Sequence, residues 1–393
     1  MKKKIKLMLV AGEVSGDSHT TELVAKLREA APEIEFEFFG LTGEKMRETN
    51  VETVVRADDL AIIGLLEITK ALPKFYKVFR QLKRAAIEKK PDAGVLVDFP
   101  DFNLPLATAL KKLGFKVIYY VSPQLWAWRS YRVRNVKRDV DLLLAILPFE
   151  KKWYESRGVS HVEYIGHPLA GEVRSELTKN EFCLKHDLKS DAPIIALLPG
   201  SRGKEVTRIL PPMLQAAAIL YAENPQTQFL IALAATRKKS DVLEIIETAR
   251  RNGVVLPDEI PILKNETREI LNASDAAAVA SGTATLETAF IGTPLVICYE
   301  VSWFNWNTLR HLINVPHYGL VNLIAEKRLA TELIQHDLKG EKLADELKII
   351  LEPRANEKMR RDLNETVKKL GAGGASKIAA AKILEFLKTN ISL

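Results

Sequence analysis

Several side chains that could do chemistry stand directly after hydrophobic stretches, and a carboxylate is the sharpest of them. Asp98 follows the apolar run at residues 95–97, which we expect to be a buried strand. Burial beside a strand end would desolvate this carboxylate and raise its pKa, which suits a general base. Asp101 is close enough in the chain to share or replace that role. The alternative is that Asp98 only caps the turn that follows it.

Two glycine-containing turns could bind phosphate. Residues 281–283 (Ser-Gly-Thr) lead directly into a helical pattern at 284–291, so free backbone N–H groups and the helix dipole would favour an anion there. The loop at 199–204 carries two cations, Arg202 and Lys204. The alternatives are a capped helix without a ligand and a solvated basic loop. Neither turn matches GxGxxG or GxxxxGK[ST], which disfavours a dinucleotide dehydrogenase or a P-loop NTPase.

These residues depend on a scaffold in which strands and helices alternate. Short β-branched runs alternate with helical patterns from residue 5 to about residue 165, and the alternation restarts at residue 194. Such alternation predicts βαβ units and parallel sheets covered on both faces. We therefore expect an α/β fold with two doubly wound, Rossmann-like domains facing a cleft and a helical C-terminal tail. Ligands bind outside the carboxyl ends of the strands in such sheets, where the polar turns fall.

The expected domains have boundaries at two points in the chain. The sequence is polar from His167 to about Pro193, which separates the two alternating halves. We expect an N-terminal Rossmann-like domain at 1–168, a C-terminal one at 169–365, and a helical tail at 366–393 that packs back on the N-terminal domain.

Composition narrows the class of protein further. The 393 residues are 47% hydrophobic and 27% charged, which excludes a disordered chain. The two cysteines lie far apart in the sequence, which indicates a reducing compartment without a disulfide framework. The net charge of +7 favours anionic partners. The basic start is followed by too short an apolar run for a signal peptide, so we expect a cytoplasmic protein that could touch a membrane surface.

A long helical pattern at residues 68–89 carries two stripes. One stripe is apolar and the other is basic, and they lie side by side at helical spacing. The pattern fits a helix that covers the sheet with a solvated basic face, or an interfacial helix that meets anionic lipid. For the second case the candidate membrane residues are Leu72, Phe75, Phe79, Lys74, Lys77 and Arg80.

The sequence contains no convincing metal site. Asp139 and Asp141 form a DxD pattern, but they precede their expected strand and so fall on the wrong edge of the sheet. The seven histidines show no HExxH spacing. We therefore expect chemistry without a metal or other cofactor.

Seven short motifs, taken together, resemble one family. The segments are residues 11–17, 98–103, 120–129, 147–150, 166–167, 198–202 and 281–283 with Glu287. Each alone is weak, but all seven in order over nearly the full length are specific. The chain resembles the lipid-A-disaccharide synthase family of inverting glycosyltransferases, which have the GT-B fold.

The resemblance implies a reaction. The donor is a UDP-activated 2,3-diacylglucosamine, the acceptor is 2,3-diacylglucosamine 1-phosphate, and the products are a β-1,6-linked tetraacyl disaccharide 1-phosphate and UDP. The N-terminal domain would then bind the acceptor and dock on the membrane, and the C-terminal domain would bind the UDP-sugar. The protein would work at the inner face of the cytoplasmic membrane, without nucleic acid, as a monomer or a homodimer.

The resemblance also implies the site residues. Asp98 would be the base, and Arg202 would stabilise the departing diphosphate. Glu287 would hold the ribose. The residues implied to bind substrate or UDP are Glu13, Ser15, Gly16, Asp17, Asp101, Asn103, Ser122, Trp128, Arg129, Gly200, Ser201, Ser281, Gly282, Thr283, Glu287 and Asn322.

The sequence departs from the usual family pattern at three positions, and other functions fit part of the pattern. Thr20 and Thr21 stand where the family usually has a Gly-Ala pair, and Val321 stands where a proline usually precedes the asparagine. These departures concern loop details and acyl preference. The rival functions are another GT-B enzyme, such as a MurG-like transferase or a UDP-N-acetylglucosamine 2-epimerase, and a non-catalytic basic protein that binds membrane or RNA.

Overall fold

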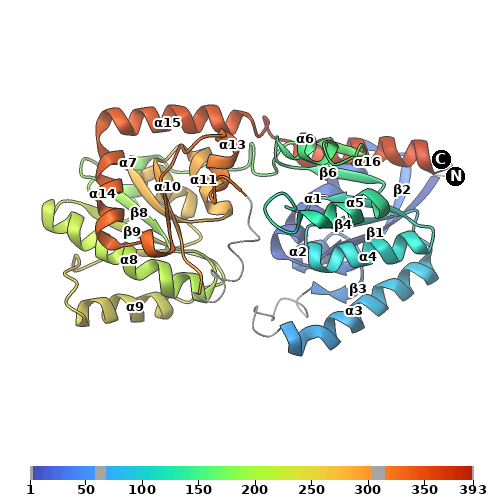
Figure 1. Ribbon diagram of the computed structural model, residues 1–393, viewed down its shortest axis with the longest axis horizontal. Coiled ribbons are helices and arrows are strands. Elements are labelled where there is room, and N and C mark those ends of the chain that lie inside the picture. The colour runs from blue at the N-terminus through green and yellow to red at the C-terminus, as the bar shows by residue number, and fades with distance from the viewer. Residues whose placement is uncertain (1–2, 58–67, 303–314, 392–393) are drawn as a thin grey trace. The chain divides into compact units, whose positions relative to one another are not determined.

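The computed structural model describes residues 3–57, 68–302 and 315–391 and divides into two compact units. Unit 1 is Met1–Pro168 with Ala372–Leu393, and unit 2 is Leu169–Gly371. Each unit is a parallel sheet with helices on both faces (Figure 1), which confirms the expected α/β fold with two doubly wound domains and a helical tail.

Unit 1 contains a sheet of seven strands within the described residues, in the order β3-β2-β1-β4-β5-β6-β7. The neighbouring strands are parallel. The strands are β1 Lys3–Ala11, β2 Ile34–Thr42, β3 Glu52–Arg56, β4 Ala93–Val97, β5 Lys116–Tyr120, β6 Leu142–Ala145 and β7 Val162–Tyr164. The helices are α1 Val14–Ala30, α2 Glu44–Arg47, α3 Ile68–Lys89, α4 Pro100–Lys112, α5 Val133–Asp139, α6 Glu150–Glu155 and α16 Ala375–Asn390, with a 3₁₀ turn at Ser130–Arg132.

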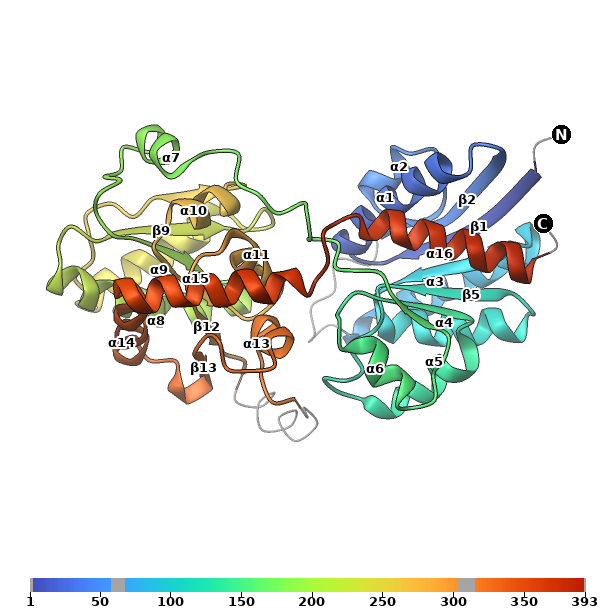
Figure 2. The same ribbon diagram turned by 90° about the horizontal axis from the view of Figure 1, so that it is seen from above.

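The alternation of side chains along β1 explains how this sheet is buried on both faces. Leu7 and Leu9 join one hydrophobic cluster with α1 and α16, whereas Met8 and Val10 join another with α3 and α4. This is the period of two that a strand imposes, and a strand covered on both faces is apolar throughout. The C-terminal helix α16 lies beside α1 (Figure 2), so the end of the chain completes unit 1.

Unit 2 contains a sheet of six strands within the described residues, in the order β10-β9-β8-β11-β12-β13, again with parallel neighbours. The strands are β8 Ile194–Leu198, β9 Gln228–Leu233, β10 Ile262–Lys264, β11 Ala276–Ala280, β12 Leu295–Tyr299 and β13 Glu332–Ile334. The helices are α7 Lys179–Lys185, α8 Gly203–Glu223, α9 Lys239–Arg251, α10 Thr267–Ala273, α11 Thr283–Ile291, α13 Leu320–Ala325, α14 Gly340–Leu351 and α15 Pro353–Lys368, with a 3₁₀ turn at Gln335–Asp337.

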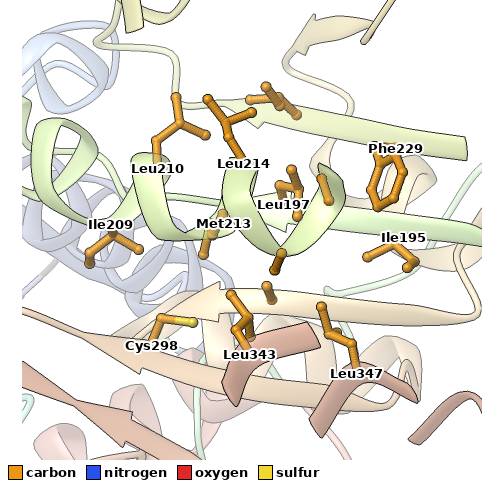
Figure 3. Close-up of a cluster of buried hydrophobic side chains, with 14 of the residues drawn as sticks. Ile195, Leu197, Ile209, Leu210, Met213, Leu214, Phe229, Cys298, Leu343 and Leu347 are labelled. Carbon is orange, nitrogen blue, oxygen red and sulfur yellow. The ribbon is translucent and has the colours of Figure 1, made fainter. Parts of the chain in front are cut away.

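The core of unit 2 lies between its sheet and the helices α8 and α14 (Figure 3). Met213 of α8 and Leu343 of α14 are fully buried, as is Leu197 of β8. Helices α8 and α14 contact each other and both contact the sheet. This packing fixes where α8 begins, and its first residue follows the turn that carries Arg202.

Both sheets contain a point where the chain reverses its direction of travel across the sheet. In unit 1 the chain moves from β1 through β2 to β3 and then returns to place β4 on the other side of β1. In unit 2 the corresponding strands are β8 and β11. The loops that follow the two central strands diverge at such a point, and the crevice they leave is the usual ligand site of this architecture.

Helix α3 has the bounds that the sequence predicts. Pro73 lies inside α3, and the helix continues through it instead of ending there. None of the described helices is long and apolar enough to cross a membrane.

Candidate functional site

The carboxyl edge of the unit 1 sheet brings two carboxylates together. Ala11 at the end of β1 pairs with Val97 at the end of β4, so the residues that follow these strands are neighbours. Asp98 is half-buried and Glu13 is exposed. The pKa of Asp98 is raised to about 6, mainly by burial and also by the negative charge of Glu13, while the backbone N–H of Phe99 opposes the shift. A carboxylate with this pKa is ionised at neutral pH and can accept a proton.

The turn after β4 is conformationally strained. Asp98 and Phe99 have φ angles of 45° and 48°, a left-handed region that non-glycine residues rarely adopt. Gly12 permits the approach of the neighbouring loop, because a Cβ at residue 12 would lie 2.5 Å from the Phe99 ring. Phe99 also stacks on Phe102, with ring centroids 5.7 Å apart. The surrounding packing therefore holds this turn in shape.

Asn103 is placed differently from the sequence expectation. It is fully buried, and its Nδ2 donates hydrogen bonds to the carbonyl oxygens of Val97 (3.0 Å) and Asp98 (2.8 Å). The resemblance implied a substrate contact for Asn103, and in the structure its side chain is 0% exposed. Its position on the turn gives it a role in holding Asp98.

Asp17 also holds protein backbone. Its carboxylate accepts hydrogen bonds from the N–H groups of Gly43 (2.9 Å), Lys45 (2.9 Å) and Met46 (3.2 Å) at the start of α2. The carboxylate of the buried Asp17, which the resemblance implied to bind substrate, is thus engaged by main-chain donors. Its neighbours Ser15, which is exposed, and Gly16, which is buried, lie in the first turn of α1.

The loop after β5 is anchored by a buried carboxylate that sequence reasoning missed. Glu150 is fully buried and accepts hydrogen bonds from Ser122 Oγ (2.7 Å), Trp126 Nε1 (3.0 Å) and the Leu147 N–H (3.0 Å). Burial raises the pKa of Glu150 to about 7, and these donors oppose that shift. Ser122, expected to contact substrate, is buried and committed to this network. The signal in the sequence was only the motif at residues 147–150.

Asp101 forms ion pairs with two arginines. Its carboxylate pairs with Arg129 Nη1 (2.8 Å) and Arg132 Nη1 (2.6 Å), and its side chain is 59% exposed. The Arg129 guanidinium in turn lies 4.0 Å from the centroid of the Trp128 ring. Asp101, Arg129 and Trp128 therefore form an accessible cluster beside the strained turn.

The carboxyl edge of the unit 2 sheet is exposed and rich in hydrogen-bond donors. After β8, Gly200 has a φ angle of 108°, and Arg202 extends into solvent with its side chain 84% exposed. The Glu205 carboxylate accepts from the N–H groups of Ser201 (3.3 Å) and Arg202 (3.2 Å), which fixes the turn at the start of α8. The Arg202 guanidinium contacts Glu205 at 3.3 Å but remains accessible to a ligand.

The second turn of this edge follows β11. Ser281 Oγ donates to the Tyr318 carbonyl (3.1 Å), while Gly282 and Thr283 are exposed at the start of α11. A Cβ added at Gly282 would meet no described atom within 4 Å. Glu287, one turn further along α11, is half-buried, and burial raises its pKa while Arg268 opposes the shift. Helix α11 thus begins at exposed residues, and the unpaired N–H groups of a first helical turn can bind an anion.

Asn322, expected to line the nucleotide site, lies in the interior of unit 2. It is fully buried, and its Nδ2 donates to the Ala330 carbonyl (2.8 Å) and to Glu332 Oε1 (2.9 Å). Its Oδ1 accepts from the N–H groups of Leu329 and Ala330, both at 2.9 Å. All the hydrogen-bonding capacity of this amide is used within unit 2.

The basic helix α3 presents a different face from the one expected. Phe75 and Phe79 pack against Phe102, at 6.1 and 6.2 Å between ring centroids, so both rings help to bury the core of unit 1. The exposed residues of this helix include Tyr76, Lys77 and Arg80, with Lys74 half-buried. The side chain of Leu72 lies outside the described residues.

The two aspartates of the DxD pattern accept hydrogen bonds from protein groups. Asp139 accepts from Thr108 Oγ1 (2.5 Å) and Arg138 Nη2 (2.6 Å), and Asp141 accepts from the Val117 N–H (2.9 Å), all away from the carboxyl edge of the sheet. No group of three His, Cys, Asp or Glu side chains in residues 3–57, 68–302 and 315–391 is placed to hold a metal ion.

Comparisons with known proteins fix the family. A family model described as lipid-A-disaccharide synthetase matches residues 7–386. The lipid-A-disaccharide synthase of Myxococcus xanthus is 41% identical over 383 residues, which covers 97% of each chain. That of Nitrosococcus oceani is 39% identical over 372 residues, which covers 94% of each chain.

Solved structures with the same fold are more distant in sequence. The UDP-GlcNAc 2-epimerase from Neisseria meningitidis bound to UDP-GlcNAc has a TM-score of 0.64 at 11% identity and covers 97% of this chain and 100% of its own. The calicheamicin glycosyltransferase CalG4 has a TM-score of 0.59 at 14% identity and covers 100% of both chains. These similarities show the GT-B fold.

Proposed function

The chain belongs to the lipid-A-disaccharide synthetase family, and from this premise we propose how its two sheet edges share one glycosyl transfer. The family makes the protein a glycosyltransferase with a UDP-sugar donor and a sugar acceptor. It transfers 2,3-diacylglucosamine from UDP to 2,3-diacylglucosamine 1-phosphate in lipid A biosynthesis. Membership sets aside both rivals, which were another GT-B enzyme (a MurG-like transferase or an epimerase) and a non-catalytic binding protein.

Asp98 is the base of this reaction. The acceptor hydroxyl attacks the anomeric carbon of the donor, the bond from that carbon to the UDP oxygen breaks, and the electron pair leaves with UDP. The proton of the hydroxyl passes to the Asp98 carboxylate. The observation that carries this assignment is a half-buried carboxylate at the switch point of unit 1, with its pKa raised to about 6 by burial and by Glu13.

The edge of unit 2 binds the nucleotide diphosphate. Charge grows on the leaving oxygen during the reaction, and donors fixed in advance at that position lower the barrier. The exposed guanidinium of Arg202 and the open N-terminus of α11 at Gly282 and Thr283 are such donors. Gly200 and Ser201 shape the first turn, and Glu287, which lies on α11, accepts hydrogen bonds from ribose hydroxyls.

Unit 1 also docks on the membrane that holds the lipid substrates. Tyr76 is 64% exposed on α3, and Lys77 and Arg80 are exposed on the same helix. An exposed aromatic ring beside cations suits an anionic lipid surface. The protein then acts as a peripheral protein at the inner face of the cytoplasmic membrane. In this arrangement Phe75 and Phe79 support the helix from within.

Vesicle sedimentation tests the docking surface. Replacing Tyr76, Lys77 and Arg80 with Ser, Gln and Gln should release the protein from vesicles of anionic phospholipid, because both the inserted ring and the charge attraction are lost. The matched control changes Lys348 and Arg361, exposed basic residues of unit 2, to Gln. Equal release of the two variants would contradict a docking surface on α3.

Product analysis tests the catalytic proposal. The protein is incubated with the UDP-diacylglucosamine and the diacylglucosamine 1-phosphate, and the lipid fraction is examined by mass spectrometry. The expected product is the tetraacyl disaccharide 1-phosphate, which Asp98→Ala should form about a thousandfold more slowly than the wild type. Product formation by Asp98→Ala at the wild-type rate would remove Asp98 as the base.

A further inference from the structure

The main-chain carbonyl of Asp98 is held by two buried side chains from different elements. The hydroxyl of Tyr119, on β5, donates to this oxygen at 2.6 Å, and Asn103 Nδ2, on α4, donates to it at 2.8 Å. Both side chains are fully buried. The Asp98 N–H donates to the Tyr120 carbonyl at 3.1 Å, so the peptide groups on both sides of the Asp98 Cα are fixed.

These hydrogen bonds hold Asp98 in a left-handed backbone conformation that is unfavourable for a residue with a Cβ. Asp98 and Phe99 are both left-handed, with φ angles of 45° and 48°. Side chains with a Cβ disfavour this region, so two such residues in succession persist only where the surroundings impose them. The direction in which the Asp98 carboxylate points depends on this backbone, because its Cβ is carried by the strained residue itself.

The hydrogen bond from Asn103 to the Asp98 carbonyl comes with an energetic cost elsewhere in the same side chain. Its Oδ1 is buried and has no hydrogen-bond partner among the described residues. An unpaired buried polar atom destabilises a fold, and most such atoms are avoided. An apolar residue at position 103 would remove that cost, but it would also remove the donor to the Asp98 carbonyl.

We propose that Tyr119 and Asn103 are positioning residues that act through the Asp98 main-chain carbonyl to aim the catalytic carboxylate. This assignment rests on the proposed role of Asp98 as the base. Neither side chain touches substrate. Their function is to keep the turn in its left-handed form so that the carboxylate meets the acceptor hydroxyl in a reactive geometry, and small misplacements of such groups reduce rates strongly.

The experiment compares Tyr119→Phe with Tyr120→Phe in the full-length protein. The two tyrosines are adjacent and fully buried on β5, but the Tyr120 hydroxyl faces Ser376 Oγ (3.4 Å) on α16 and not the turn. Tyr119→Phe should lower kcat about tenfold, with KM for both lipids and UDP affinity within about twofold of the wild type. Tyr120→Phe should keep kcat within about twofold of the wild type.

A pH profile adds a readout that lost stability alone would not move. A looser turn exposes the Asp98 carboxylate to solvent, so its pKa falls and the acid limb of the Tyr119→Phe profile moves to lower pH. The charged group that faces Asp98 from the neighbouring loop is Glu13, which Tyr119→Phe leaves unchanged. Asn103→Ala is the second variant and should give the same separation of kcat from KM.

The outcomes separate this proposal from the one on which it rests. If Asp98→Ala is inactive while Tyr119→Phe and Asn103→Ala both have the kcat of Tyr120→Phe, the positioning role is overturned and the base remains. If Asp98→Ala itself turns over normally, both assignments fall. Loss of kcat in Tyr119→Phe with retained UDP affinity and a retained melting temperature supports the positioning role.

Discussion

The two sheet edges share one topology but present opposite chemistry. In unit 1 the edge carries two carboxylates, Glu13 after β1 and Asp98 after β4, and the turn that carries Asp98 is packed and hydrogen bonded on its inner side. In unit 2 the edge carries Arg202, with 84% of its side chain exposed, and the open backbone at Gly282. One edge is built to hold a group still, and the other is built to receive a ligand.

The difference follows from what each edge must do in the reaction. A base needs a raised pKa and a fixed direction, and both require partial burial and support from the protein. A diphosphate brings its own charge and needs donors that are not already satisfied. The doubly wound sheet supplies a crevice in both units, and the loop residues decide which of these two tasks the crevice performs.

The largest expected effect comes from removing the carboxylate of unit 1. Asp98→Ala should reduce turnover by about a thousandfold, because general-base catalysis is lost while the binding groups remain. UDP affinity, measured by calorimetry, should match the wild type. Asp101→Ala is the matched control: its carboxylate is engaged by Arg129 and Arg132, so its loss should be within about tenfold. Equal losses of turnover in Asp98→Ala and Asp101→Ala would contradict the assignment of Asp98 as the base.

The next effect is the pH dependence of stability that the buried carboxylate of Glu150 gives to unit 1. The pKa of Glu150 is raised by burial from 4.5 to about 7, so the folded state binds the proton more tightly than the unfolded chain does. Its contribution to stability is therefore present below pH 4.5 and is lost as the pH rises through about 7. The lost contribution amounts to roughly 3 kcal/mol.

Denaturant unfolding of Glu150→Gln against the wild type measures this contribution. Because Gln does not titrate, the wild type should lose stability relative to the variant between about pH 4.5 and 7 and stay level above that range. A difference in free energy of unfolding that is constant across this range would mean that Glu150 has an ordinary pKa.

A smaller effect is expected at the edge of unit 2. Arg202→Ala should weaken UDP binding by about tenfold to a hundredfold, the range for one hydrogen bond to a charged group. Lys204, in the first turn of α8, carries the same charge as Arg202 but cannot form the paired hydrogen bonds of a guanidinium. Lys204→Ala should therefore weaken UDP binding less than Arg202→Ala does. Unchanged UDP affinity in Arg202→Ala would move the nucleotide away from this edge.

The smallest expected effect is the influence of Glu13 on the pKa of Asp98 in unit 1. Glu13 raises the pKa of Asp98, so Glu13→Gln should lower that pKa from about 6 toward its ordinary value. The acid limb of the activity profile would then move to lower pH, by less than about one unit, because burial is the larger cause. A shift to higher pH would contradict the charge interaction between these two residues.

Much of the scaffold could be predicted from the sequence. The helical pattern at residues 68–89 is α3, and the restart of the alternation at residue 194 is the start of β8, because a clear change in the apolar pattern marks each of them. The strands β3 and β13 were not expected. Both lie at an edge of their sheet, are short and begin with a glutamate, so their pairing depends on neighbours that periodicity does not reveal.

The site was predictable where burial follows from local sequence. The three apolar residues before Asp98 predict that its carboxylate is desolvated, and in the structure burial is the main cause of its raised pKa. By contrast, Asn103, Asp17 and Asn322 were expected to contact substrate, but they hydrogen bond to protein groups in the interior. A motif shows that a residue belongs to a turn, but it does not show whether the side chain points outward or inward.

UDP titration of Asp98→Ala and Arg202→Ala by calorimetry tests the division of labour between the two edges most directly. The account predicts wild-type affinity for Asp98→Ala, which has lost turnover, and affinity about tenfold to a hundredfold weaker for Arg202→Ala. Weakened UDP binding in Asp98→Ala together with unchanged binding in Arg202→Ala would contradict it, because the nucleotide would then depend on unit 1.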